Sequence, residues 1–118
     1  MSNGYEPDKW CVLKLTTAAV LPDVEDSVHY RVFGSWYGGW AGSDSWRMNS
    51  GITKATSVDG YYAFDGSSGS MYYCGKNTYG TSGYGWSVLS GIISRQADIG
   101  IKIEVMLEET DFSVLDYK

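Results

Sequence analysis

Hydrophobic and polar residues alternate over several short stretches of this chain. In residues 10–16, Cys11, Leu13 and Leu15 share one side of an extended chain, which is the pattern of a half-buried strand. Short apolar or aromatic stretches bounded by turn residues predict further strands at 28–33, 45–49, 52–57, 61–65 and 71–74. We therefore expect the chain between residues 10 and 74 to be mostly β structure.

Turn residues separate these strands. Asp59-Gly60 predicts a tight hairpin between 52–57 and 61–65, because both positions tolerate a positive φ. Three further connections are predicted from glycine, proline, serine or acidic residues: a loop at 18–27, a turn at Gly38-Gly39 and a turn at 65–70. Short connections favour strands that pair antiparallel with their neighbours in the chain.

The period changes after residue 80 and predicts one amphipathic helix over 82–98. Trp86, Leu89, Ile92 and Ile93 fall at helical spacing, Thr81 or Ser82 offers a cap at the start, and Gly100 offers a stop. A glycine inside a helix costs about 1 kcal/mol relative to alanine. We therefore expect Gly91 to mark close packing of this helix against a strand.

Alternation returns in residues 101–107 and predicts a final strand. The tail 108–118 is acidic but contains Phe112, Val114 and Leu115, which should dock part of it on the body, whereas we expect residues 1–8 to be flexible. The 118 residues and 43% hydrophobic content suit one domain, 1–118. The predicted fold class is α+β, an antiparallel twisted β-meander packed by one amphipathic helix and completed by a final strand.

Composition adds an unusual aromatic run. Residues 34–51 contain three Trp interleaved with glycine and small hydroxyl residues, a mixture that is costly to order and favours a recognition surface. No stretch approaches the ~18 apolar residues of a membrane span, and residues 1–8 are polar, unlike a signal peptide. We expect an intracellular protein with no membrane partner, in which Cys11 and Cys74 are reduced, buried side chains.

The net charge of −5 is unevenly distributed and argues against general DNA binding. Residues 1–26 carry a charge of −3 and residues 104–118 a charge of −4, whereas residues 27–103 carry +2. A small anion could be held by the central part, although a long polyanion would be repelled. The alternative is that the acidic ends simply keep the protein soluble.

Candidate catalytic and metal-binding residues are few. His29 is the one histidine, so any serine or cysteine mechanism must run through it, and its place in a predicted strand favours a structural role. The two cysteines and His29 lack the spacing of a metal site, and the chain contains no Walker or Rossmann motif. We predict no catalytic residue, no metal and no cofactor, and we lean towards a protein that is not an enzyme.

The residues that favour ligand binding form a nucleotide-like inventory. Aromatic faces can sandwich a base, amides and hydroxyls can read its edge, and Arg or Lys can neutralise phosphate. The N–H groups at the start of the predicted helix can also attract an anion. The predicted ligand-binding residues are Trp36, Tyr37, Trp40, Trp46, Arg47, Asn49, Ser50, Lys76, Tyr79, Ser82 and Tyr84. The alternative is that they are core residues or part of a homo-oligomer interface.

Four blocks of sequence carry a resemblance to a known group. They are Lys9-Trp-Cys-Val-Leu-Lys-Leu-Thr-Thr17, Tyr30-Arg-Val-Phe-Gly-Ser-Trp-Tyr-Gly-Gly39, Asp44-Ser-Trp-Arg-Met-Asn-Ser-Gly51 and Gly69-Ser-Met-Tyr-Tyr-Cys74. With these blocks, most of the chain resembles small uncharacterised proteins of T4-like tailed phages, including marine cyanophages. The resemblance implies action in the cytoplasm of an infected bacterium but no catalytic residue. In that family a histidine often stands where this chain has Gly75, which further weakens a metal-based mechanism.

These observations lead to one function hypothesis and several alternatives. The leading hypothesis is a non-enzymatic phage accessory protein that binds a small anionic ligand, most plausibly sequestering a nucleotide signal of host defence. Its pocket would be built from the loops 34–51 and 76–85. The alternatives are a module that inhibits or redirects a host enzyme, a minor virion protein, or an enzyme acting through His29. The many aromatic residues also favour a homodimer, in which they would be covered.

Overall fold

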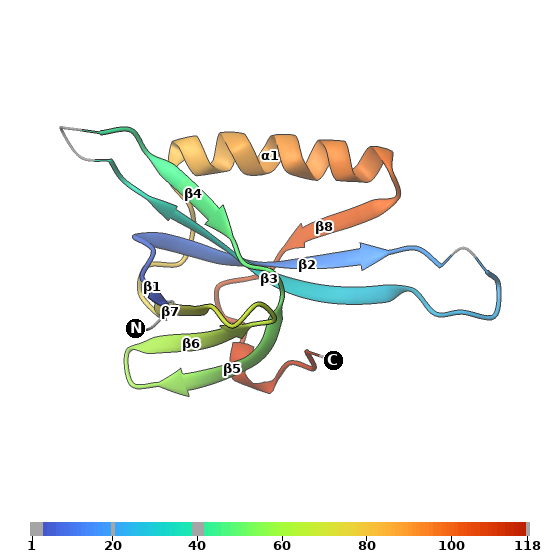
Figure 1. The fold of residues 1–118 in the computed structure, drawn as a ribbon, viewed down its shortest axis with the longest axis horizontal. Helices are drawn as coiled ribbons and strands as arrows, with labels where there is room; N and C mark the ends of the chain where they lie inside the picture. The colour runs from blue at the N-terminus through green and yellow to red at the C-terminus, as the bar shows by residue number, and fades with distance from the viewer. Residues whose placement is uncertain (1–3, 20, 39–41, 118) are drawn as a thin grey trace.

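The computed structural model describes residues 4–19, 21–38 and 42–117 and arranges them in three layers, one helix and two β-sheets (Figure 1). The strands are β1 (Gly4–Tyr5), β2 (Lys9–Thr17), β3 (Ser27–Trp36), β4 (Ser45–Met48), β5 (Ile52–Val58), β6 (Tyr61–Gly66), β7 (Met71–Gly75) and β8 (Ile101–Val105). The helix α1 (Gly83–Asp98) precedes β8, and a short 3-10 helix, η2 (Phe112–Val114), lies in the C-terminal tail.

Strand β2 lies in the middle layer, and the first half of it is buried on both faces. Its sheet has the order β4-β3-β2-β8 with antiparallel pairing throughout. Cys11 and Leu13 pack with Leu89 of α1 on one face, whereas Trp10 and Val12 pack against the second sheet on the other. A strand covered on both faces needs no polar position. The half-buried pattern predicted for 10–16 is therefore wrong for its first half.

The second sheet has the order β1-β7-β6-β5. Strands β5, β6 and β7 form an antiparallel meander, and the core between the sheets includes Phe64, Tyr72 and Trp10. The predicted α+β fold with a meander, one helix and a final strand is confirmed. The division of the strands between two sheets was not part of that prediction.

Residues 4–8 are not a flexible extension, which corrects the expectation for this part of 1–8, whereas residues 1–3 lie outside the described residues. Strand β1 pairs with β7 in parallel, with Tyr5 opposite Tyr72, and Pro7 is buried. The Tyr5 ring lies 5.0 Å from the Tyr72 ring and 6.5 Å from the Trp36 ring. Aromatic packing of this kind adds stability beyond the burial of area, and it explains why this short segment is held in place.

The predicted ends of the helix and the predicted hairpin are confirmed. Ser82 is the N-cap of α1 and its hydroxyl accepts a hydrogen bond from the Gly85 N–H at 3.0 Å. Gly100, with a φ of +86°, follows the last turn of the helix. Between β5 and β6, Gly60 has a φ of +88°, whereas Asp59 does not take a positive φ.

The expectation that Gly91 packs closely against a strand is wrong. A Cβ atom added at Gly91 would meet the side chain of Arg95, one turn further along the same helix, at 3.1 Å. Gly85 occupies a close-packed position instead, because a Cβ there would overlap with Thr81 Oγ1 and lie 3.2 Å from the Cβ of Ser35 in β3. The buried glycine is thus at the first turn of the helix, where α1 crosses β3.

The C-terminal tail docks through one aromatic side chain above all. Phe112 is fully buried, with its ring 5.6 Å from the Trp10 ring and 5.9 Å from the Tyr79 ring. Leu115 packs against the same core, whereas Val114 is exposed. The predicted docking is therefore confirmed for Phe112 and Leu115 and wrong for Val114.

Cys11 and Cys74 are buried free thiols, as predicted. Burial raises the pKa of Cys11 to about 12 and also raises the pKa of Cys74, because a thiolate would lose its hydration there. Neither group is a reactive nucleophile at neutral pH. Among the described residues, no helix is long and apolar enough to cross a membrane.

Candidate functional site

Two residues of the predicted site, Trp46 and Arg47, point to opposite faces of β4. Trp46 stacks on Phe33 with the ring centres 5.5 Å apart and an interplanar angle of 11°, on the face covered by α1. The Arg47 guanidinium lies 4.7 Å from the centre of the Tyr5 ring, on the face of the second sheet. Adjacent side chains of a strand alternate between its faces, so the Trp46 ring and the Arg47 guanidinium have different neighbours, although both residues line the cavity described next.

Arg47 lines a cavity of about 360 Å³ together with part of the predicted aromatic set. Its lining residues are Gly4, Tyr5, Glu6, Trp36, Ser45, Trp46 and Arg47. A hydrogen bond holds the Trp36 side chain in place, since its Nε1 donates to the Glu6 carbonyl at 3.0 Å. Glu6 also brings a carboxylate to the cavity, and this charge offsets that of Arg47.

Lys76 lies in a different and acidic cavity. The cavity has a volume of about 520 Å³ and contains the carboxylates of Glu108, Glu109 and Asp111. The Lys76 Nζ donates to Ser57 Oγ at 2.7 Å and lies 4.9 Å from the centre of the Tyr62 ring. The surrounding carboxylates would repel a phosphate. Because Lys76 and Arg47 line different cavities, the structure does not bring them together around one anion.

Tyr79 has a structural position in the middle layer of the molecule. Its hydroxyl donates to the Met106 carbonyl and accepts from the Val12 N–H at 3.2 Å, so it bridges β2 and the residue that follows β8. Its ring lies 4.7 Å from the Trp10 ring. Burial raises the pKa of Tyr79, which keeps the hydroxyl protonated and able to donate. The Tyr79 ring packs against Trp10 and Phe112 and also lines the acidic cavity, so its surroundings do not favour the base of an anionic ligand.

Two N–H groups at the start of α1, those of Ser82 and Gly85, donate hydrogen bonds to serine hydroxyls of the protein. The Ser82 N–H donates to Ser35 Oγ at 3.3 Å, and the Ser82 hydroxyl accepts from Gly85. Tyr37 and Tyr84 are exposed, and the predicted ligand residue Trp40 lies outside the described residues. Of the N–H groups expected to orient a ligand near Ser82, those of Ser82 and Gly85 are thus engaged within the protein.

Asn49 connects β3 to the segment that follows β4 through two hydrogen bonds. Its backbone N–H donates to the Val32 carbonyl at 3.0 Å, and its side-chain Oδ1 accepts from the Val32 N–H at 2.8 Å. The Nδ2 atom is buried and has no hydrogen-bond partner among the described residues. This pair of bonds holds the following segment, which begins with Ser50, beside the edge of β3.

A cavity of about 440 Å³ lies beside the segment that begins with Ser50, and we name it the Arg31 cavity. It is lined by residues of β2 and β3, of the segment between β4 and β5, of the start of β5 and of the turn between β6 and β7. The first residue of β8 and Tyr117, near the C-terminus, complete the lining. The lining residues are Leu15, Thr17, His29, Arg31, Ser50, Gly51, Ile52, Thr53, Ser67, Ile101 and Tyr117. Of the predicted ligand residues, Ser50 is the one that lines it.

The Arg31 cavity carries positive charge and hydroxyl groups. His29 and Arg31 are two residues apart on β3 and therefore share a face. Among the described residues, neither forms an ion pair, and Arg31 Nη1 donates a hydrogen bond to Met48 Sδ at 3.9 Å. The lining contains no carboxylate. A guanidinium left without a carboxylate partner retains its donors for a ligand.

Ser50 lines this cavity, and its hydroxyl hydrogen is available to donate a hydrogen bond. Its oxygen accepts hydrogen bonds from Ser67 Oγ and from the Ser68 N–H, both at 2.9 Å. Because these bonds use its acceptor positions, the Ser50 O–H is left to donate elsewhere. Tyr117, in contrast, donates its own hydroxyl to the Phe112 carbonyl, and its ring packs edge-on against Tyr30 at 5.4 Å while the residue also lines the cavity.

The sequence contained one signal for this cavity, the alternation of His29 and Arg31 on a predicted strand. Reasoning from the sequence missed it because the other lining residues come from segments that meet only in the folded chain. No group of His, Cys, Asp and Glu suited to a metal ion is found among the residues that the structure describes. Comparisons with protein-family models, curated proteins and solved structures found no match.

Proposed function

We propose that this protein binds a small anionic ligand in the Arg31 cavity and does not transform it. One observation carries the proposal: of five well-formed cavities in the described part of the chain, this one has a basic lining with no carboxylate. Each of the other four includes at least one Asp or Glu. Its volume of about 440 Å³ falls in the usual range for small-molecule sites, about 300–1,000 Å³.

The chemistry of the lining suits a phosphate or carboxylate attached to a ring. Arg31 would meet the anion with two parallel N–H donors, and the Ser50 hydroxyl would donate a further hydrogen bond. His29 adds a donor on the same strand face, and Tyr117 with the neighbouring apolar side chains offers a surface for a ring. Binding fits better than catalysis, since no hydrogen bond joins His29 to a hydroxyl among the described residues.

We propose a nucleotide as the ligand class, and sequestration of a nucleotide signal of host defence as the role. The resemblance to T4-like phage proteins supports this role by analogy alone. The site residues then differ from those expected from the sequence. Ser50 keeps its role, Arg31 and His29 replace Arg47 and Lys76, and Tyr117 replaces the tryptophans.

Calorimetric titration with ADP, cyclic AMP and inorganic phosphate tests the proposal. Replacing Arg31 by Gln removes a charged donor pair and should weaken binding about 10- to 100-fold. The matched control is Arg95→Gln, which removes an exposed arginine on α1 and should leave binding unchanged. Absence of heat with all three probes, together with a clean mass of freshly purified protein in native mass spectrometry, would contradict anion binding.

A second candidate is a module that binds a host protein. The observation in its favour is the exposure of Tyr37, Tyr84 and Trp86, since aromatic side chains are enriched where binding energy concentrates in interfaces. A pull-down from host lysate tests it with the variants Tyr37→Ala and Trp86→Ala. A partner lost with these variants, and not displaced by nucleotides, would select this reading over the anion site.

A further inference from the structure

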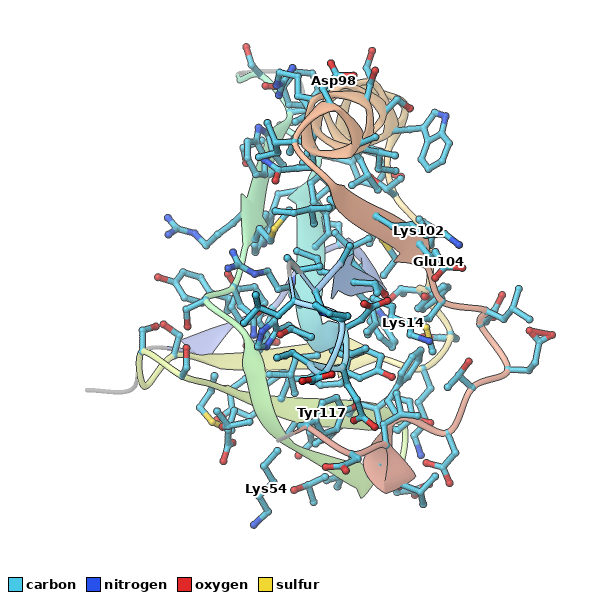
Figure 2. All side chains as sticks on the ribbon, turned by 90° about the vertical axis from the view of Figure 1, so that its right-hand side faces the viewer. Lys14, Lys54, Asp98, Lys102, Glu104 and Tyr117 are labelled. Atoms are coloured by element: carbon cyan, nitrogen blue, oxygen red, sulfur yellow. The ribbon has the colours of Figure 1, made fainter. Side chains whose placement is uncertain are left out.

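Strand β8 is a free edge of the middle sheet. It is the last strand in the order β4-β3-β2-β8, so it pairs on one side with β2. Figure 1 shows it running below α1, and Figure 2 shows Lys102 and Glu104 projecting from it at the outside of the molecule. A free edge presents a row of backbone donors and acceptors that can pair with another strand.

The pairing with β2 determines which backbone groups of β8 point outward. Met106 donates its N–H to the Val12 carbonyl at 2.8 Å, in register with the pairing of Lys14 with Glu104. In an antiparallel pair every second residue exchanges hydrogen bonds with its partner. The even-numbered residues of this segment therefore bond to β2, and the N–H and C=O groups of Ile101, Ile103 and Val105 point away from it.

The sequence of β8 is self-complementary about Ile103. If a second copy pairs antiparallel with Ile103 opposite Ile103, Lys102 lies opposite Glu104 of the other copy, and Ile101 lies opposite Val105. In this alignment the odd-numbered residues of the two copies form the hydrogen-bonded pairs. This agrees with the outward direction of their backbone N–H and C=O groups. Lys102 and Glu104 then form the non-hydrogen-bonded pairs, in which opposite side chains come closest.

We propose that two copies of this chain pair through their β8 strands, with a two-fold axis at Ile103. The side chains of Lys102 and Glu104 are 71% and 47% exposed, and they already form an ion pair of 3.8 Å within one chain. Pairing gives each of them an opposite charge across the axis. Lys14, opposite Glu104 on β2, adds a further positive charge to the same row.

Exposed apolar side chains flank this edge in the same alignment. Ile99 is 70% exposed just before β8, and Leu107 is 69% exposed just after it. With the two-fold axis at Ile103, Ile99 of one copy lies near Leu107 of the other copy. Their exposure in a single chain is explained if a second copy covers them.

The other described edge strands are β1, β4 and β5, and the longest of them, β5, is less suited to such pairing. Its register shifts between Ile52 and Lys54, and η2 packs against it. A register irregularity and a covering segment both hinder pairing with a further strand. Strand β8 has neither, so the dimer would join two middle sheets edge to edge into one eight-stranded sheet.

Sedimentation velocity at low salt over a concentration series tests the proposal with charge-reversed variants. Lys102→Glu and Glu104→Lys each place like charges opposite one another, and each should weaken self-association at least about tenfold. An equimolar mixture of the two variants pairs Glu with Lys again, so association should return as a heterodimer. Lys54→Glu, a reversal on β5, is the matched control and should associate like the unaltered chain.

Amide hydrogen exchange at low and high protein concentration locates the interface. The amides of Ile101, Ile103 and Val105 should gain protection on association, because they donate across the axis. A chain that stays monomeric at about 0.5 mM, where a dimer with a Kd of about 0.1 mM would be mostly formed, would overturn the proposal. It would equally be overturned by a dimer that ignores the charge reversals or leaves these amides unprotected.

Discussion

Replacing Tyr79 by phenylalanine removes one oxygen atom from the connection between β2 and the end of β8. The hydroxyl accepts from the Val12 N–H at 3.2 Å and donates to the Met106 carbonyl. Met106 N–H and the Val12 carbonyl are joined directly at 2.8 Å, so the hydroxyl supplies the second half of this hydrogen-bonded pair. Without it, a donor and an acceptor in the interior lose their partner.

The expected cost of this substitution follows from those two groups. An unsatisfied buried group costs about 1–3 kcal/mol, and partial closure of the strands recovers some of it, so we expect a loss of about 2 kcal/mol in unfolding free energy. For a domain of this size, the loss corresponds to a fall in Tm of roughly 8 °C. The phenylalanine ring would still pack against Trp10, so a loss of this size reports on the hydroxyl.

Urea unfolding followed by tryptophan fluorescence measures this effect, with scanning calorimetry as the second measurement. The control is Tyr84→Phe, which removes the hydroxyl of an exposed side chain and should change stability by less than about 0.5 kcal/mol. If Tyr79→Phe were as stable as the unaltered chain, the hydroxyl would not bridge the strands. Tyr79 would then be available again as a ligand residue.

Three further predictions concern the core, the helix and alkaline pH. Phe112→Ala should lower the unfolding free energy by about 3–5 kcal/mol in urea unfolding, whereas Val114→Ala, in the same short helix but exposed, should change it by less than about 0.5 kcal/mol. Gly91→Ala should raise the unfolding free energy by about 1 kcal/mol, because the added methyl meets only the flexible side chain of Arg95; a loss instead would show close packing there. The folded-state pKa of Cys11 lies above its ordinary value, so the folded chain keeps a proton that the unfolded chain releases. The contribution of this thiol to stability should therefore be full below pH 9.0 and be lost towards pH 12; urea unfolding at stepped pH measures this, and a rise in stability over that interval would contradict the burial of this thiol.

The local elements of this fold were predictable because each depends on residues close together in the chain. The helix 82–98 follows from apolar spacing with a capping serine and a terminal glycine, and the structure places it at Gly83–Asp98. The hairpin at Asp59-Gly60 follows from two residues. The pairing of β1 with β7 and the division into two sheets depend on contacts between distant segments, for which local patterns carry no information.

The candidate site was predictable only in part, for a related reason. The aromatic and basic residues of 34–51 are close in sequence, but strand alternation turns Trp46 and Arg47 away from each other. Lys76 is surrounded by acidic residues from the tail, some 30 positions later in the chain. Ser50 was identified because hydroxyl groups favour ligand binding in general, whereas the contribution of Arg31 and Tyr117 required the folded chain.

The measurement that tests the binding site most directly is an amide NMR titration of the ¹⁵N-labelled protein with ADP. We expect chemical-shift changes at His29, Ser50, Gly51 and Ser67, accompanied by a change in the side-chain N–H signal of Arg31. An unchanged spectrum at millimolar ADP would contradict a nucleotide site. Shifts gathered around Arg47 or Lys76 instead would show that an anion binds but that the Arg31 cavity does not hold it.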